Sequence, residues 1–336
     1  MSLLNAPFDV RARIAEANEP RRGEKPMDPD VRPEFVHPTG GFWIDVSTAK
    51  ETLAGKLELG RVSEEEFALL DHFIDNGFVV LKNAVDHVLI DTILADIDRS
   101  LEDGSRMLQS KARRLVADRE TIQLPEAKLL DLHMESRAAQ AAIFAPRIKR
   151  FAELVMDAVP LATQTLTFYY GSTQPVHSDV AFVRVNSANE FVAAWIALED
   201  IEPNSGELVY YPGSHKLPQT LFHGRSVWHQ PQSPEAEGWG PKLEAQAQEA
   251  GLARTLFRPK KGDALIWHSN LFHGGDARLD AAKTRKSLVA HYCPSFRQPP
   301  YMYKREDVEK LRIDLAPAEG YAALGSPPYA YVSGAN

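Results

Sequence analysis

Two short segments, far apart in the chain, contain the residue types that bind a transition metal. In the first segment, QPVHSD at 174–179, His177 and Asp179 stand two residues apart. In an extended chain their side chains point to the same side, so both can reach one ion. The second segment, 261–276, contains His268 and His273. Either histidine completes a set of two imidazoles and one carboxylate, which is the ligand set of non-haem Fe(II) oxygenases.

A basic residue with a hydroxyl neighbour follows these histidines at Arg285-Lys286-Ser287. Arg285 and Ser287 share one face of a predicted strand, and a planar guanidinium binds both oxygens of a carboxylate. An iron site with three protein ligands leaves positions for a bidentate co-substrate and O2. The pattern therefore favours Fe(II) with a dicarboxylate co-substrate, of which 2-oxoglutarate is the most common. The alternative for Arg285 is a solvated surface charge near Lys283 and Lys286.

Short strands must position these residues. After residue 159 the chain contains seven segments rich in Val, Ile, Tyr, Phe and Thr, separated by turn residues. Strands this dense, without helices between them, predict an antiparallel sandwich or barrel packed against earlier helices. The predicted strands are 163–170, 180–186, 191–198, 208–211, 253–257, 264–268 and 287–292.

Helices are predicted before this β-rich part. Ser63, with Glu66 three residues later, has the capping-box pattern, and the following helix is expected to end at Gly77. The other predicted elements are a buried strand at 77–81 and helices at about 87–101, 146–158 and 305–313.

At 336 residues the chain could form one large domain or two small ones. Residues 1–60 are rich in Pro, Arg and Asp with weak periodicity, and they predict an N-terminal arm. We expect a single domain over 61–336. Within it, 217–250 is rich in Gln, Pro, Glu and Trp and too long for a hairpin, which predicts a lid.

Composition excludes several classes of protein. A formal net charge of -8 argues against a nucleic-acid partner, which would need a basic face. The single cysteine, Cys293, excludes an intramolecular disulfide or a cysteine zinc cluster and fits a reducing compartment. No apolar run reaches the roughly 20 residues of a transmembrane helix, and the two ends show no targeting signal. We therefore expect a cytoplasmic protein with no membrane partner; the sequence carries no signal for an oligomeric state.

Taken in order, the motifs resemble the phytanoyl-CoA dioxygenase-like family of Fe(II)/2-oxoglutarate-dependent oxygenases. The resemblance covers about residues 63–295 and implies a mainly β fold with flanking helices, a double-stranded β-helix of the jelly-roll, cupin-like type. The motifs are NGFVVLK at 76–82, HSD at 177–179, AWIALED at 194–200, NSGEL at 204–208, YPGSHK at 211–216, GD at 262–263, HG at 273–274 and RKS at 285–287.

The resemblance also chooses between the two histidines. In the family, the second histidine ligand precedes a small residue and stands about a dozen positions before the co-substrate arginine. His273 precedes Gly274 and stands 12 residues before Arg285, whereas His268 stands 17 before it. The implied iron ligands and catalytic centre are thus His177, Asp179 and His273, with His268 packing or hydrogen-bonding at a strand end.

Further residues are implied around the co-substrate. Arg285 and Ser287 would hold the distal carboxylate of 2-oxoglutarate, with Trp195 near it. Gln174 and Thr165 are further candidates for polar contacts. Core packing is the alternative for Trp195. His291, at even spacing from Arg285, either faces the pocket or is an ordinary core histidine.

The implied activity is that of an Fe(II)- and 2-oxoglutarate-dependent dioxygenase. It would hydroxylate an unactivated C–H bond of a small-molecule substrate with release of succinate and CO2. Asp179 favours hydroxylation, or a related desaturation or cyclisation, because related halogenases have a small residue there. The alternatives are a non-catalytic jelly-roll binding protein and a cupin-like metal enzyme that does not use 2-oxoglutarate. Val176 and the 217–250 insert depart from the family pattern on the substrate side, which leaves a fatty acyl-CoA substrate unassigned.

Overall fold

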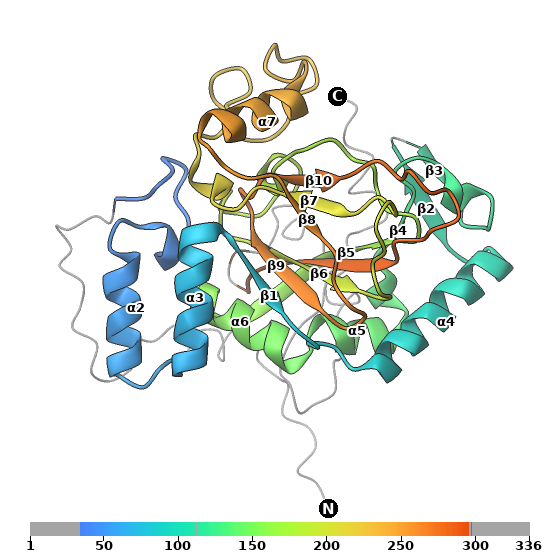
Figure 1. Cartoon of the computed structure of the whole chain (residues 1–336), viewed down its shortest axis with the longest axis horizontal. Coiled ribbons are helices and arrows are strands. Elements are labelled where there is room, and N and C mark those ends of the chain that lie inside the picture. The colour runs from blue at the N-terminus through green and yellow to red at the C-terminus, as the bar shows by residue number, and fades with distance from the viewer. Residues whose placement is uncertain (1–33, 112, 296, 298–336) are drawn as a thin grey trace, which may run out of the picture.

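The β-rich part of the chain folds into two antiparallel sheets, one packed over the other (Figure 1). The computed structural model describes residues 34–111, 113–295 and 297. The large sheet contains, in spatial order, β1 (Phe78–Leu81), β9 (Ala264–His268), β6 (Val192–Ala197), β11 (Ser287–Pro294), β5 (Pro160–Phe168), β4 (Lys128–Leu130), β2 (Met107–Ser110) and β3 (Arg113–Val116). The small sheet contains β10 (His273–Gly275), β7 (Leu208–Tyr210) and β8 (Thr255–Phe257). The predicted jelly-roll class is confirmed.

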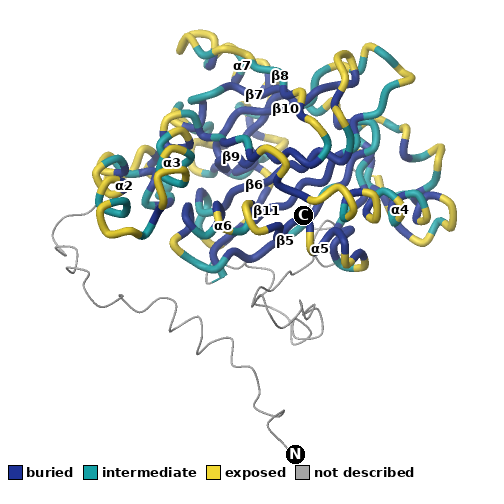
Figure 2. The backbone as a smooth tube through the Cα atoms, turned by 60° about the horizontal axis from the view of Figure 1, so that its bottom comes forward, coloured by how far each residue is buried: buried dark blue, intermediate teal, exposed yellow. Residues whose placement is uncertain are grey.

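The central strands of the large sheet are covered on both faces, as the dark tube of Figure 2 shows. Successive side chains of a strand point to opposite faces. On β6, Ala194 and Ile196 belong to the core under the helices, whereas Ala193 and Trp195 belong to the core shared with the small sheet. We call the face toward the small sheet the inner face. Burial on both faces explains why these strands are apolar along their whole length.

Helices cover the outer face of the large sheet (Figure 1). In α3 the Ser63 hydroxyl accepts from the Glu66 N–H at 3.2 Å, and the Glu66 carboxylate accepts from the Ser63 N–H at 2.8 Å. The helix ends at Gly77, whose φ of 73° is left-handed. Both cap predictions are confirmed. The α-helices are α2 (Ala49–Glu58), α3 (Glu64–Asn76), α4 (His87–Asp103), α5 (Arg137–Ile143), α6 (Pro146–Met156) and α7 (Trp239–Glu249), and the 3-10 turns are η1 (Trp43–Asp45), η2 (Thr121–Gln123), η3 (Leu132–Met134), η4 (Asp179–Ala181) and η5 (Ser214–Lys216).

The predicted strand at 180–186 is wrong. Asp179–Ala181 form η4, and the residues after it pair with no strand. The apolar alternation is real, because Val183 and Val185 are buried in a small cluster with Phe191. Alternating burial does not need a hydrogen-bonded neighbour, so a correct pattern led to an incorrect element.

Several elements had no clear sequence pattern. The strand β10 contains only three residues, two of them glycine, and it depends on pairing with β7. The strands β2 to β4, and the helices α2, α5 and α7, were also not predicted. The predicted helix at 305–313 lies outside the described residues.

Part of the predicted arm lies against the domain. Phe42, Ile44 and Leu53 are buried in the core that the other helices share. Residues 34–60 therefore pack on the domain, and the rest of the arm is outside the described residues. None of the helices in the described part of the chain has the length and apolar character that crossing a bilayer requires.

Candidate active site

Two histidines distant in sequence are joined through their backbones. The His177 N–H donates to the His273 carbonyl at 2.8 Å, and the His273 N–H donates to the His177 carbonyl at 2.9 Å. The glycines after His273 permit this approach. A Cβ on Gly274 would lie 2.9 Å from the Gln174 carbonyl oxygen, and one on Gly275 would lie 2.7 Å from a side-chain oxygen of the same segment. A small residue after His273 is therefore a packing requirement.

The structure brings the three predicted ligands together. One ligand atom from each of His177, Asp179 and His273 lies within 4.8 Å of the others, and all three residues are buried. Each imidazole Nε2 stands 3.6 Å from Asp179 Oδ1. Asp179 reaches this position from the first residue of η4 rather than from an extended strand.

The hydrogen bonds of the two rings determine which nitrogen is available to a metal. The Nδ1 of His177 lies 2.9 Å from the Pro175 carbonyl, and the Nδ1 of His273 lies 2.9 Å from the Leu271 carbonyl. Because a carbonyl only accepts, each Nδ1 carries a proton, and Nε2 is the nitrogen that a metal could bind. Burial lowers the pKa of His273 to about 4, so this imidazole is neutral at neutral pH. Two imidazoles that present Nε2 beside a carboxylate suit a divalent transition metal.

Two further side chains hold the carboxylate of Asp179. The Trp267 Nε1–H donates to Asp179 Oδ2 at 2.8 Å, and His291 Nε2 lies 3.3 Å from the same oxygen. His291 thus faces the site, which decides between the two interpretations that the sequence left open. Burial alone would raise the pKa of Asp179, but the neighbouring His273 and His291 hold it well below its usual range. The carboxylate stays ionised, with Oδ1 directed at the two imidazoles.

Arg285 is a buried cation for which the described residues supply no ion pair. Its Nε and Nη1 form no hydrogen bond with any residue that the structure describes. The guanidinium lies 5.8 Å from the ring centres of both Phe168 and Trp195. Burial lowers the pKa of Arg285 to about 10, although the charge of Glu207 acts in the opposite direction, so the group is still charged at neutral pH. A buried, unpaired charge is costly, and this position therefore suits an anionic ligand.

Ser287 and Trp195 share the inner face with this cation. Ser287 pairs with Ala197 and Phe168, and its buried hydroxyl has no hydrogen-bond partner within the described ranges. Trp195 packs edge-on against Phe257 at 5.6 Å and lies beside the guanidinium of Arg285. Trp195 is thus a core residue of the inner face and also borders the position that an anion would occupy.

One short segment connects the cation to the three predicted ligands. A Cβ on Gly171, whose φ is +81°, would lie 2.6 Å from Arg285 Nε. Six residues later the same segment reaches His177. Gln174 lies between them and is half-buried; its carbonyl accepts from the Gly275 N–H at 2.9 Å. A role for the Gln174 side chain in binding a co-substrate stays a prediction.

Thr165 does not belong to the site. It pairs with Ala290 on the outer face, and its hydroxyl lies 2.9 Å from His133 Nδ1. The expectation that Thr165 contacts the co-substrate is wrong. Register decides this point, because neighbouring residues of a strand face opposite sides of the sheet.

Lys128 is an inner-face residue that the sequence analysis missed. Its neighbours Leu129 and Leu130 pair with Thr167 and Leu166, so alternation directs Lys128 to the inner face. Burial lowers the pKa of Lys128, whereas the nearby carboxylates of Glu126 and Asp179 act to raise it. A lysine in a three-residue strand carries no sequence signal that distinguishes it from a surface lysine.

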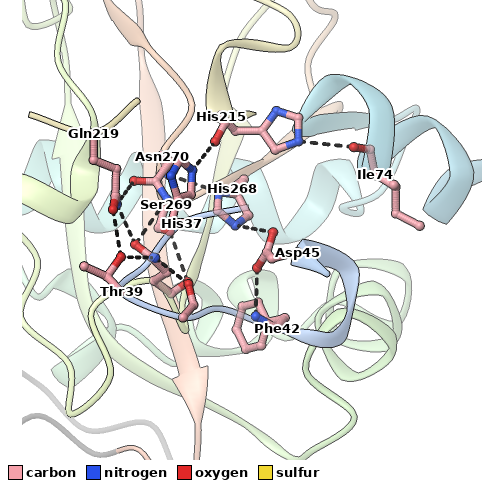
Figure 3. Close-up of polar contacts among 12 residues, drawn as sticks. His37, Thr39, Phe42, Asp45, Ile74, His215, Gln219, His268, Ser269 and Asn270 are labelled. Carbon is pink, nitrogen blue, oxygen red and sulfur yellow. Dashed lines mark hydrogen bonds and ion pairs between the residues drawn. The ribbon is translucent and has the colours of Figure 1, made fainter. Parts of the chain in front are cut away.

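His268 belongs to a separate polar network (Figure 3). Its Nε2 lies 3.1 Å from Asp45 Oδ1, and its Nδ1 accepts from the Asn270 N–H at 3.1 Å. His37 Nε2 lies 2.7 Å from the His215 carbonyl, and Gln219 donates to the Asn270 side chain at 2.7 Å. The network fastens the segment before α2 to the loop that leads into His273. The expected hydrogen-bonding role of His268 at a strand end is confirmed.

The comparisons with known proteins agree with this geometry. The family model described as phytanoyl-CoA dioxygenase (PhyH) matches residues 73–286. The chain belongs to this family. It is 25% identical over 228 residues to the peroxisomal phytanoyl-CoA dioxygenase of Bos taurus, a match that covers 65% of each chain. The matched part is thus slightly less than two thirds of that relative.

A second relative and a solved structure are also similar to this chain. The chain is 26% identical over 231 residues to the ectoine dioxygenase of Nocardia farcinica (strain IFM 10152), covering 64% of this chain and 72% of the relative. Among solved structures, it is similar to the epimerase SnoN in complex with Fe3+, alpha ketoglutarate and nogalamycin RO. That likeness has a TM-score of 0.53 and 19% identity, and it covers 79% of this chain and 96% of SnoN. At this identity it establishes the fold of the PhyH-family chain.

Proposed function

We propose that the protein is an Fe(II)- and 2-oxoglutarate-dependent dioxygenase that hydroxylates an unactivated C–H bond and releases succinate and CO2. Membership of the PhyH family supports the proposal. The observation that carries it is the buried Arg285, two of whose nitrogens have no hydrogen-bond partner in the described part of the chain, and which one short segment connects to the His177, Asp179 and His273 cluster. A metal enzyme without an anionic co-substrate would not need such a charge.

One set of residues would bind the metal. His177, Asp179 and His273 would hold Fe(II), which supplies the oxidising chemistry with O2 and 2-oxoglutarate when bound. Trp267 and His291 keep one oxygen of Asp179 engaged, so that the other oxygen faces the metal position.

The co-substrate position is provided by a different set of residues. Arg285 and Ser287 would bind the far carboxylate of 2-oxoglutarate, since both have unused donors and both are buried. Phe168 and Trp195, whose rings lie 5.8 Å from the Arg285 guanidinium, would exclude water from that contact, which would strengthen it and orient the co-substrate.

The names of the relatives and of the SnoN complex refer to small molecules, namely phytanoyl-CoA, ectoine and nogalamycin RO. A small-molecule substrate is therefore part of the proposal, and the 217–250 insert is proposed as its lid. We also propose a cytoplasmic location, because the single cysteine, Cys293, suits a reducing compartment. Fractionation of cells that express the protein tests the location.

Anaerobic absorption spectroscopy tests the central proposal. Adding Fe(II) and 2-oxoglutarate to the purified protein is expected to produce a metal-to-ligand charge-transfer band in the visible region. The His177→Ala variant should lose the band, whereas the exposed His87→Gln variant should keep it. A folded wild-type protein without the band refutes the proposal. Succinate formation that depends on 2-oxoglutarate separates it from a cupin-like enzyme of another type.

A further inference from the structure

An exposed aromatic ring stands directly beside one of the proposed iron ligands. Phe182 is 49% exposed, although its neighbours Ala181 and Val183 are buried. Its ring lies edge-to-face on His177, with 5.6 Å between the ring centres. A single exposed apolar residue is ordinary on a protein surface. This one is informative because it is next to the site where the reaction would take place.

The insert completes an aromatic cluster around that ring, which consists of Phe182, Phe222, His229 and Trp239. The His229 ring lies 5.4 Å from Phe182 and 5.7 Å from Trp239, and the Trp239 ring lies 5.8 Å from Phe182. Phe222 packs on the other two insert residues at 5.1 and 5.3 Å. Phe222 and Trp239 are buried and His229 is half-buried. Phe182 is therefore the member of the cluster whose ring is most open to a ligand.

The aromatic cluster is held in place by contacts with the ligand segment. The His229 N–H donates to the Ala181 carbonyl at 2.9 Å. At the start of α7, a Cβ on Gly240 would lie 2.9 Å from the Val176 carbonyl oxygen, so the helix packs closely on the residue before His177. Trp239 Nε1–H donates to the Thr220 hydroxyl at 2.9 Å. The cluster is thus formed in advance and does not need a substrate to assemble it.

A cation lies on the same side of this segment. From 181 to 186, buried and exposed residues alternate, so Phe182 and Arg184 both face outward. The Arg184 guanidinium lies 5.3 Å from the Trp228 ring centre and forms no ion pair with any described residue. An exposed ring next to the metal position is thus followed, two residues later, by a positive charge that no described residue pairs.

We propose that Phe182 and Arg184 form the substrate subsite of this enzyme, and that the substrate is a ring-bearing apolar small molecule with an anionic group. The ring would pack on Phe182 beside His177, and the anion would bind Arg184 at the outer end. This assignment rests on the proposed function. It also gives the insert a role, because His229 and Trp239 support the ring that meets the substrate.

Binding of defined probes to the anaerobic protein with Fe(II) and 2-oxoglutarate tests the subsite. The probes are 2-naphthoate and 3-phenylpropionate as ring-bearing anions, 2-naphthylmethanol as the uncharged ring, and octanoate as a linear anion, each titrated by calorimetry. We expect the ring-bearing anions to bind more tightly than octanoate. Phe182→Ala should weaken 2-naphthoate about 2- to 10-fold, the range of one aromatic contact. Phe182→Leu, which keeps apolar volume, should weaken the ring probes but not octanoate.

Binding of the anionic group by Arg184 is tested with a second variant. Arg184→Gln should weaken 2-naphthoate about 2- to 5-fold, as for an exposed ion pair, and leave 2-naphthylmethanol unchanged. Leu279→Ala, at an exposed apolar residue outside the cluster, is the matched control and should change the affinity for neither probe. The subsite assignment is overturned if no ring-bearing anion binds, if octanoate binds as tightly, or if Phe182→Ala has no effect. The charge-transfer band, recorded in the same samples, reports separately on the proposed function.

Discussion

Burial of the Arg285 guanidinium is unfavourable unless an anion binds to it. The guanidinium is fully buried, and two of its three nitrogens have no hydrogen-bond partner among the described residues. Replacing Arg285 by Met removes the charge and keeps a flexible apolar chain of similar length. The unliganded protein and the co-substrate complex should therefore respond in opposite directions.

The expected magnitudes follow from the burial and from the lost contacts. Replacing a buried charge by a packed apolar side chain is neutral or stabilises by about 1–4 kcal/mol, so unliganded Arg285→Met should unfold at the wild-type temperature or above it. Each hydrogen bond to a charged group contributes about 1.5–3 kcal/mol. Loss of one such bond should raise the Kd of 2-oxoglutarate about 10- to 150-fold, and loss of two should raise it further.

Thermal unfolding of the unliganded protein, with anaerobic titration of 2-oxoglutarate, measures both effects. Arg106→Met is the matched control, because Arg106 is also buried but pairs with Glu135 at 2.8 Å. It should lower the unfolding temperature and leave the Kd of 2-oxoglutarate unchanged. If Arg285→Met is destabilised like Arg106→Met and binds 2-oxoglutarate normally, Arg285 is structural and the reasoning is refuted.

Three further outcomes are expected. Trp267→Phe keeps a ring beside His273 but loses the donor to Asp179, so Fe(II) affinity should fall about 10- to 100-fold in a metal titration; unchanged affinity would show that this bond does not position the carboxylate. Gly171→Ala should lower the free energy of unfolding by about 1–3 kcal/mol, because its φ is +81°, and should weaken 2-oxoglutarate binding through contact with Arg285; normal binding contradicts the contact. Burial raises the pKa of Cys293, so its thiol stays protonated at pH 8 and should react with a thiol reagent only after unfolding; rapid labelling of the native protein counts against this.

Short-range patterns accounted for much of what could be predicted. The cap of α3 was predictable because Ser63, Glu66 and Gly77 act within one or two helical turns. The strands β6, β9 and β11 were predictable because burial on both faces requires a continuous apolar run. The strand β10 was not, because its three residues are extended only through pairing with β7.

The amino-acid sequence by itself determined the residue types at the proposed iron site, their spacing, and the arginine that follows them. These properties are local, so they can be recognised without knowing which strands are neighbours. In the same way, the alternation at 181–186 correctly marked which side chains are buried, although no strand forms there.

Only the tertiary structure decided which side chains face one another. It directed His291 to Asp179, Thr165 away to His133, and Lys128 to the inner face. The reason is strand register: a shift of one residue turns every side chain of a strand to the opposite face, and register depends on partners far away in the chain. The same is true of the unpaired state of Arg285, which depends on all the residues folded around it.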